Sequence, residues 1–267
     1  MIDVSVLGLG AVGATVARAI GTGRIPGLRL VAASAANQSA ANEKLSAIMD
    51  TPPPVLSLQE ARDIGDLVVE CLPPALFRDT AETVLRSGRA MVAVSVGALL
   101  EHSDLIELAR KNGGTLHIPS GAIAGLDAVR AAAEGDVQSV ELTTSKPPSG
   151  FQQSPYLDAK GIDLARLHGP TVIYEGPATE GVHLFPKNVN VVAALSLAGI
   201  GPERTRLRLL ADPALARNSH SVTVHSDATH LSTTIENLPD PGNPRTSMIT
   251  ALSVISLLRG IAGPLRF

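Results

Sequence analysis

The sequence has a single cysteine, no tryptophan and only 2% aromatic residues among its 267 positions. The lone cysteine, Cys71, cannot form an internal disulfide, and its isolation excludes a multi-cysteine zinc site. No apolar run reaches the roughly 20 residues that a membrane-spanning helix needs, and the N-terminus lacks the basic segment and cleavage site of a signal peptide. We therefore expect a cytoplasmic protein, with no membrane partner and a core of Ala, Val, Leu and Ile.

A strong charge of either sign is also missing. The formal net charge is −3, which provides no positive field suited to nucleic acid. Hydrophobic residues make up 45% of the chain and charged residues 18%, as in ordinary globular proteins. We expect one large domain or two modest ones, acting on a small molecule and not on nucleic acid.

The first 120 residues alternate between apolar runs and helical stretches. The apolar runs, typical of buried parallel strands, cover residues 4–7, 28–33, 67–71, 90–94 and 115–118. The helical stretches cover residues 11–20, 36–48, 76–86 and 101–111. This alternation predicts βαβ units and a doubly wound parallel sheet, so we interpret residues 1–120 as a Rossmann domain.

A glycine motif of the form G-x-G-x-x-G joins the first predicted strand to the first predicted helix. In this context Gly8 permits the tight turn, Gly10 lets the backbone approach a pyrophosphate, and Gly13 lets helix and strand pack closely. Ala11 and Val12 open the helix, whose N-terminus favours an anion. The motif therefore predicts a dinucleotide site.

The second strand of a Rossmann domain usually ends near an acid that binds the ribose of NAD. Here no acid is present, and no arginine follows that would pair with the 2′-phosphate of NADP. Ser34 and Asn37 can hydrogen-bond either group, although Asn37 is equally suited to cap a helix. The sequence therefore predicts NAD or NADP as cofactor and does not choose between them.

After residue 120 the pattern changes to that of a second, α+β domain, which we assign to residues 121–244. Alternating polar and apolar residues predict strands of a mixed or antiparallel sheet at 137–144, 205–210 and 220–225. Residues 145–170 are predicted to form a long loop. Pro244 suits the first turn of a final helix, and we expect residues 245–267 to pack back on the first domain. The predicted fold class is thus α/β, a Rossmann domain with a second α+β domain.

Four segments resemble those of the L-aspartate dehydrogenase family. They are residues 118–125 (IPSGAIAG), 185–191 (FPKNVNV), 211–213 (ADP) with 217–220 (RNSH), and 235–237 (IEN) with 243–247 (NPRTS). The resemblance implies oxidation of L-aspartate to iminosuccinate, which hydrolyses to oxaloacetate and ammonia, and the reverse reductive amination. It also implies that the imine can supply nicotinamide cofactor synthesis. We further expect a homodimer or higher homo-oligomer.

Residue by residue, the resemblance implies that His220 is catalytic and that Ala124 and Asn190 contact the dinucleotide. A histidine suits the chemistry, because removing the ammonium proton or activating water needs a base that titrates near neutrality. His220, His225 and His230 are five residues apart, which fits neither strand nor helix periodicity for a shared metal face. We therefore expect no metal site.

The two carboxylates of aspartate need cations or N–H donors. Lys187 and Asn188 are candidates on one segment, and Thr246 and Ser247, beside Arg245, are candidates at the expected helix start. Lys146 is expected to be structural or exposed.

Two other interpretations remain open. A homoserine dehydrogenase-like or dihydrodipicolinate reductase-like enzyme would share this architecture. A non-catalytic sensor that binds NAD(P)H would bind the cofactor without turnover.

Overall fold

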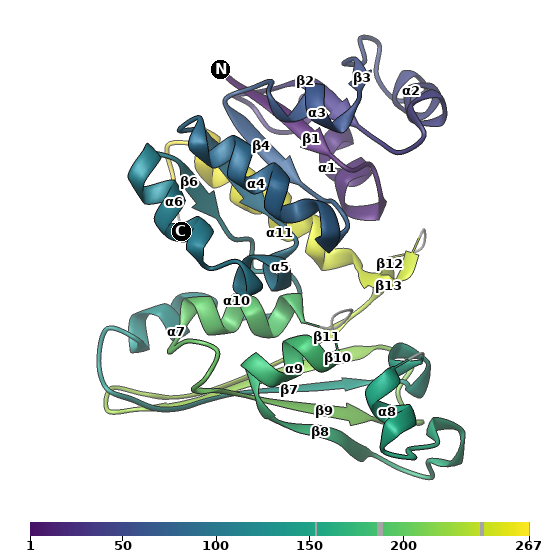
Figure 1. Ribbon diagram of the computed structural model, residues 1–267, viewed down its shortest axis with the longest axis vertical. Coiled ribbons are helices and arrows are strands. Elements are labelled where there is room, and N and C mark those ends of the chain that lie inside the picture. Colours follow the sequence, from purple (N-terminus) through teal and green to yellow (C-terminus); the bar gives the residue numbers. More distant parts are fainter. Residues whose placement is uncertain (153, 186–188, 241–242, 267) are drawn as a thin grey trace. The chain divides into compact units, whose positions relative to one another are not determined.

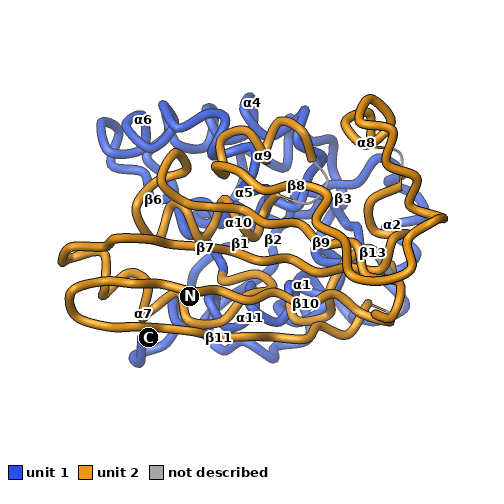
Figure 2. The backbone as a smooth tube through the Cα atoms, turned by 90° about the horizontal axis from the view of Figure 1, so that it is seen from below, with its two compact units in different colours: residues 1–119, 250–267 blue, residues 120–249 orange. Residues whose placement is uncertain are grey.

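The structure is a computed structural model that describes residues 1–152, 154–185, 189–240 and 243–266. The chain divides into two compact units, one formed by Met1–Pro119 with Thr250–Phe267 and the other by Ser120–Ile249 (Figure 2). No helix in the described ranges is both long enough and apolar enough to cross a membrane.

The first unit contains a six-stranded parallel sheet in the order β3-β2-β1-β4-β5-β6. Its strands are β1 (Ile2–Leu7), β2 (Leu28–Ser34), β3 (Val55–Leu56), β4 (Leu67–Glu70), β5 (Ala90–Ala93) and β6 (Thr115–His117). The strand order reverses between β1 and β4, and ligands of doubly wound sheets bind at the carboxyl ends of strands at such a point. The Rossmann architecture predicted for this half is confirmed.

Helices flank this sheet (Figure 1): α1 (Ala11–Gly21), α2 (Gln38–Ser46), α3 (Leu58–Arg62), α4 (Phe77–Arg86), α5 (Val96–Glu101), α6 (Asp104–Asn112) and α11 (Met248–Ala262). Helix α4 packs through one apolar stripe, which consists of the buried residues Phe77, Ala81, Val84 and Leu85. From α11, Val254 and Leu258 join the hydrophobic core of this unit.

The helix expected at 101–111 is present as α6, although it begins three residues later than expected. The preceding helix, α5, ends at Glu101, because His102 leaves the helical conformation at φ −122° and ψ 50°. Helix α6 then begins at Asp104, whose carboxylate is 2.8 Å from the Arg78 guanidinium.

The second unit contains a five-stranded mixed sheet in the order β11-β10-β7-β9-β8. Its strands are β7 (Val137–Lys146), β8 (Thr171–Pro177), β9 (Thr205–Ala211), β10 (Asn218–Ser226) and β11 (His230–Asn237). Strands β7 and β9 are parallel and the other pairs are antiparallel. Helices α7 (Leu126–Ala132), α9 (Ala178–Leu184) and α10 (Asn190–Ala198) lie along one face of the sheet (Figure 1). The predicted mixed sheet is confirmed.

The long loop expected at 145–170 is wrong. Residues 145–170 are not one loop: they include the end of β7, the 3₁₀ turns Pro148–Phe151 and Leu164–Arg166, and α8 (Pro155–Ala159). Edge-to-face contacts among Phe151, Tyr156 and Phe185 hold this segment, with ring centroids 5.4 to 6.4 Å apart.

Pro244 does not begin the last helix. It lies in β13 (Asn243–Ser247), which pairs antiparallel with β12 (Pro239–Asp240), and the helix begins at Met248. In this short ribbon the Asn243 backbone N–H donates to the Asp240 carboxylate at 3.1 Å. A two-stranded ribbon consists of edges, and proline is tolerated on edge strands.

Candidate active site

Two glycines of the turn are required by the backbone around them, and the third faces open space. Gly8 has φ +89°, and its N–H donates to the Ser34 carbonyl at 3.0 Å. A Cβ on Gly8 would overlap the Cys71 carbonyl oxygen, and a Cβ on Gly13 would overlap the Gly8 carbonyl oxygen. A Cβ on Gly10 would have no neighbour within 4 Å. The space beside Gly10 is therefore open to a bound group.

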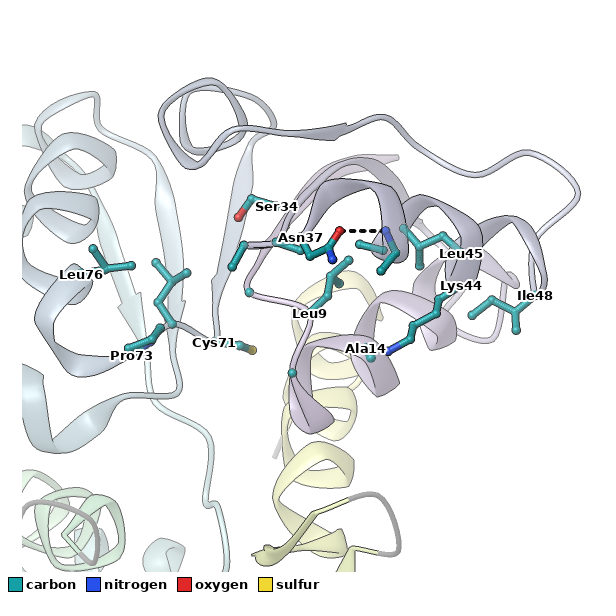
Figure 3. A pocket seen from close by; sticks show the side chains of 17 residues that line it. Leu9, Ala14, Ser34, Asn37, Lys44, Leu45, Ile48, Cys71, Pro73 and Leu76 are labelled. Atoms are coloured by element: carbon teal, nitrogen blue, oxygen red, sulfur yellow. Dashed lines mark hydrogen bonds between the residues drawn. The ribbon is translucent and has the colours of Figure 1, made fainter.

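That space belongs to a cavity of about 640 Å³ above the carboxyl ends of β1, β2 and β4 (Figure 3). Its lining includes Gly8, Leu9, Gly10, Ser34, Lys44, Cys71, Leu72, Pro73 and Leu76. The N-terminus of α1 follows the glycine turn, and its first intrahelical bond runs from the Ala14 N–H to the Gly10 carbonyl at 2.9 Å. The N–H groups of Ala11, Val12 and Gly13 precede that bond, which makes this end suited to a phosphate.

The polar residues at the end of β2 and in the following α2 have different roles. Ser34 is the last residue of β2, is buried, and lines the cavity. Asn37 caps α2, because its side-chain oxygen accepts from the Ala40 N–H at 3.0 Å. Lys44 also lines the cavity, although the sequence analysis did not select it. Asn37, Ala40, Ala41 and Lys44 follow each other at intervals of three, one and three residues, which places them on one side of a helix. This periodicity is the sequence signal that could have identified Lys44.

Glu70 is a second site residue that no sequence pattern indicated. It is fully buried at the end of β4, and its carboxylate accepts from the backbone N–H groups of Leu72 at 2.7 Å, Ser95 at 3.0 Å and Val94 at 3.2 Å. Burial raises the pKa of Glu70, while these N–H donors oppose the rise. Glu70 thereby joins β5 to the Cys71–Pro73 wall of the cavity.

Cys71 lines the same cavity. Burial raises the pKa of its thiol well above the ordinary value, and the charge of Glu70 adds to the rise. A thiol held in its protonated form reacts slowly.

His220 lies on the helix-covered face of the second sheet and is 4% exposed. In the β10–β7 register it stands opposite Thr144, and its Nδ1 is 2.9 Å from the Thr144 Oγ1. Burial, and after it the positive charge of Lys146, lowers the pKa of His220 to about 3. The imidazole is therefore neutral at pH 7.

Lys146 was expected to be structural or exposed. It is half-buried, and it follows Thr144 by two residues on β7, so both side chains stand on the same face. Burial lowers the pKa of its ammonium to about 8. The structure thus brings Lys146, Thr144 and His220 together.

Ala124 and Asn190 are both exposed in this unit. The Ala124 carbonyl accepts from the Thr233 hydroxyl at 3.2 Å, and the Ala122 carbonyl accepts from the Asn237 amide at 2.9 Å. These bonds hold residues 122–124 along β11, the strand beside His220. Asn190 begins α10.

The predicted substrate ligands are described only in part. Thr246 accepts from the Asn243 amide at 3.2 Å, and Ser247 is buried at the end of β13. Lys187 and Asn188 lie outside the described residues, as does the Arg245 side chain.

The other histidines of the strand pair form a surface contact. His225 and His230 face each other across β10 and β11 with their Nδ1 atoms 2.7 Å apart. Over the ranges that the structure describes, no three His, Cys, Asp or Glu side chains are grouped to hold a metal.

Comparisons with known proteins agree for both units. The family model for the aspartate dehydrogenase C-terminal domain matches residues 127–261, and that for the homoserine dehydrogenase NAD binding domain matches residues 8–119. An L-aspartate dehydrogenase of Bradyrhizobium diazoefficiens is 43% identical over 96% of this chain and 90% of its own length. An L-aspartate dehydrogenase of Methanosarcina barkeri is 40% identical over 100% of this chain and 99% of its own length.

Solved structures give the same result. The crystal structure of aspartate dehydrogenase from Thermotoga maritima is 25% identical, with a TM-score of 0.74 over 100% of this chain and 99% of that one. A hyperthermophilic archaeal homoserine dehydrogenase in complex with NADPH has a TM-score of 0.56 at 13% identity, a likeness of fold alone.

Proposed function

Because the chain belongs to the L-aspartate dehydrogenase family, we propose that it oxidises L-aspartate to iminosuccinate with NAD or NADP and catalyses the reverse reductive amination. Water then converts the imine to oxaloacetate and ammonia. One observation supports the chemistry most directly: a neutral, buried imidazole, that of His220, lies within the unit that carries most of the family match.

The first unit supplies a fitting dinucleotide site. The open space beside Gly10 and the first N–H groups of α1, from Ala11 to Gly13, suit the pyrophosphate, and Ser34 suits the adenosine ribose. Ala124 and Asn190 of the second unit are proposed as further contacts, by resemblance to the family. When bound, the nicotinamide ring exchanges a hydride with the substrate carbon.

His220 is proposed as the general base. Its Nδ1 faces the Thr144 hydroxyl, and if Nδ1–H donates to that oxygen, Nε2 keeps the lone pair that takes a proton. The proton comes from the substrate ammonium or from the water that attacks the imine. Thr246, Ser247, Lys187 and Asn188 are proposed to bind the substrate.

A substrate screen tests this function. Purified protein is incubated at alkaline pH with NAD or NADP and separately with L-aspartate, D-aspartate, L-glutamate and L-homoserine, and cofactor reduction is followed at 340 nm, the absorbance of the reduced nicotinamide. We expect turnover with L-aspartate and loss of the signal with D-aspartate. L-homoserine is included because the NAD-binding model that matches is named for homoserine dehydrogenase. Turnover of L-homoserine alone, or cofactor binding without any turnover, would overturn the proposal.

We also propose that the enzyme works in the cytoplasm, where the nicotinamide dinucleotide pool is available, and that its imine supplies cofactor synthesis.

A homodimer or higher homo-oligomer is proposed, with its interface on the face of the second sheet opposite His220. That face carries both signs of charge, with Glu175 paired to Arg206 and Arg208, so a second copy related by two-fold symmetry can match it. Light scattering on the purified protein tests the assembly, and a monomeric mass would contradict it.

A further inference from the structure

We propose that Lys146 binds a carboxylate of the substrate beside His220, so that it selects acidic amino acids and prepares His220 for catalysis. This inference rests on the proposed function and assigns a substrate contact to a residue that was expected to be structural or exposed.

Strand register brings Lys146 to this place. Thr144 lies opposite His220 across β7 and β10, and Lys146 is the next residue of β7 on the same face. The strand ends at Lys146, and its carbonyl accepts from the Asp212 N–H at 2.9 Å, which fixes the backbone here.

The turn after β7 leaves room for the lysine side chain. A Cβ on Gly150 would lie 3.2 Å from both Cβ and Cδ of Lys146. The ammonium nitrogen stands 5.9 Å from the centre of the Phe151 ring. The methylene chain thus runs under the turn at 148–151, and the charged end stays near the aromatic cluster.

The charges of this sheet are sorted between its two faces. On the helix-covered face that carries His220, the described strands have one basic side chain of the lysine or arginine type, which is Lys146. Arg206 and Arg208 pair with Glu175 on the opposite face, and Arg217 lies 4.0 Å from Glu236. An anion that reaches His220 therefore meets the positive charge of Lys146.

A carboxylate at Lys146 also changes His220. The pKa of His220 is low first because of burial and then because of the charge on Lys146. A substrate carboxylate against the ammonium offsets that charge, so the imidazole becomes a stronger base when the correct substrate is bound. Substrate selection and base strength are then linked through one lysine.

The test compares Lys146→Met with Lys160→Met, because Lys160 also lies over an aromatic ring, 5.8 Å from the centre of Tyr156, but is exposed. Succinate, a dicarboxylate with no amine to oxidise, serves as inhibitor, so its inhibition constant measures carboxylate binding without turnover. We expect Lys146→Met to raise this constant and the KM for L-aspartate about 100-fold, the factor that corresponds to one charged hydrogen bond. Affinity for NADH stays unchanged, and Lys160→Met behaves like wild type.

Lys146→Arg keeps the charge and is the second variant, with an expected inhibition constant closer to wild type than that of Lys146→Met. An unchanged inhibition constant in a folded Lys146→Met protein would overturn the assignment. Equal losses in the Arg and Met variants, accompanied by lower thermal stability, would assign Lys146 a structural role and overturn it as well. If the wild-type protein does not oxidise L-aspartate at all, the proposed function fails independently of Lys146.

Discussion

At the scale of single residues, His220 must act as a base from a position that penalises its charged form. Burial and the Lys146 ammonium both lower the pKa of His220, to about 3. The unfolded chain has no such environment, and its histidines titrate near 6.5. The same burial that keeps the imidazole neutral for proton transfer therefore makes stability depend on pH.

The sign of that dependence follows from proton binding. Between pH 6.5 and 3 the unfolded state binds a proton at His220 and the folded state does not, so folding stability falls as the pH is lowered. We expect the wild-type free energy of unfolding to drop by about 2 kcal/mol more than that of His220→Asn between pH 7 and pH 5. Urea denaturation of both proteins across this range measures the difference. Parallel pH profiles would show that His220 titrates normally.

Gly10 and Gly13 offer a matched pair in one turn. Gly10→Val adds a side chain into open space at the cavity, so we expect near-wild-type stability and a dissociation constant for NADH at least 100-fold higher. Gly13→Ala adds a methyl group against the Gly8 carbonyl, and we expect a loss of about 2 kcal/mol of stability. Fluorescence titration and thermal unfolding separate the two. Wild-type affinity in Gly10→Val would contradict the site.

Ser34 decides cofactor choice if it stands at the ribose. We expect wild type to use both NAD and NADP, and Ser34→Asp to lower kcat/KM for NADP relative to NAD about tenfold or more, because the acid repels the 2′-phosphate. Ser57→Ala is the control, since Ser57 caps α3 outside the cavity lining and its loss should cost about 1 kcal/mol of stability without shifting the ratio. An unmoved ratio in Ser34→Asp, or a wild type that accepts one cofactor only, would contradict this role.

At the scale of elements, Glu70 connects the ends of two parallel strands. Its two carboxylate oxygens accept backbone N–H groups from both sides of the β4–β5 edge. A glutamine has one accepting oxygen, so Glu70→Gln places an amide N–H₂ against one of these sets of donors. We expect a loss of about 1 to 3 kcal/mol of stability.

Chemical denaturation of Glu70→Gln measures that loss. The control is Glu82→Gln, at an exposed pair with Arg86 where the charge contributes about 0.5 kcal/mol or less. Equal midpoints for the two variants would show that the buried carboxylate does not support this edge.

The elements also show what sequence patterns can reveal. The strands of the first unit were predicted because parallel strands buried on both faces are continuous apolar runs. Strand β3 has only two residues and is too short for any pattern, and β11 has the polar run Ser232, Thr233 and Thr234 at its centre. Helix α10 is apolar on nearly every side, so it shows little helical periodicity.

The site was predictable to the extent that its chemistry is local. The glycine motif is contiguous, so its residues identify the turn directly. Glu70 and Lys146 acquire their roles only when strands distant in sequence become neighbours. His220 was one of seven histidines, and the family resemblance rather than its residue type distinguished it.

At the scale of the whole molecule, each unit has its own core and its own part of the chemistry. The first has the glycine turn and the cavity, and the second has His220, Thr144 and Lys146. Aromatic residues are few, with four Phe and two Tyr in the chain, yet Phe151, Tyr156, Tyr174 and Phe185 gather in the second unit. The cluster stabilises the segment that follows Lys146.

The central claim is that His220 provides the base for oxidation of L-aspartate, and the kcat of a folded His220→Ala protein tests it most directly. Positioned general base catalysis contributes about 10² to 10⁴ in rate, so we expect kcat on L-aspartate to fall by that factor while the dissociation constant for NADH stays at its wild-type value. A His220→Ala protein that unfolds like wild type and retains near-normal kcat on L-aspartate would contradict the account.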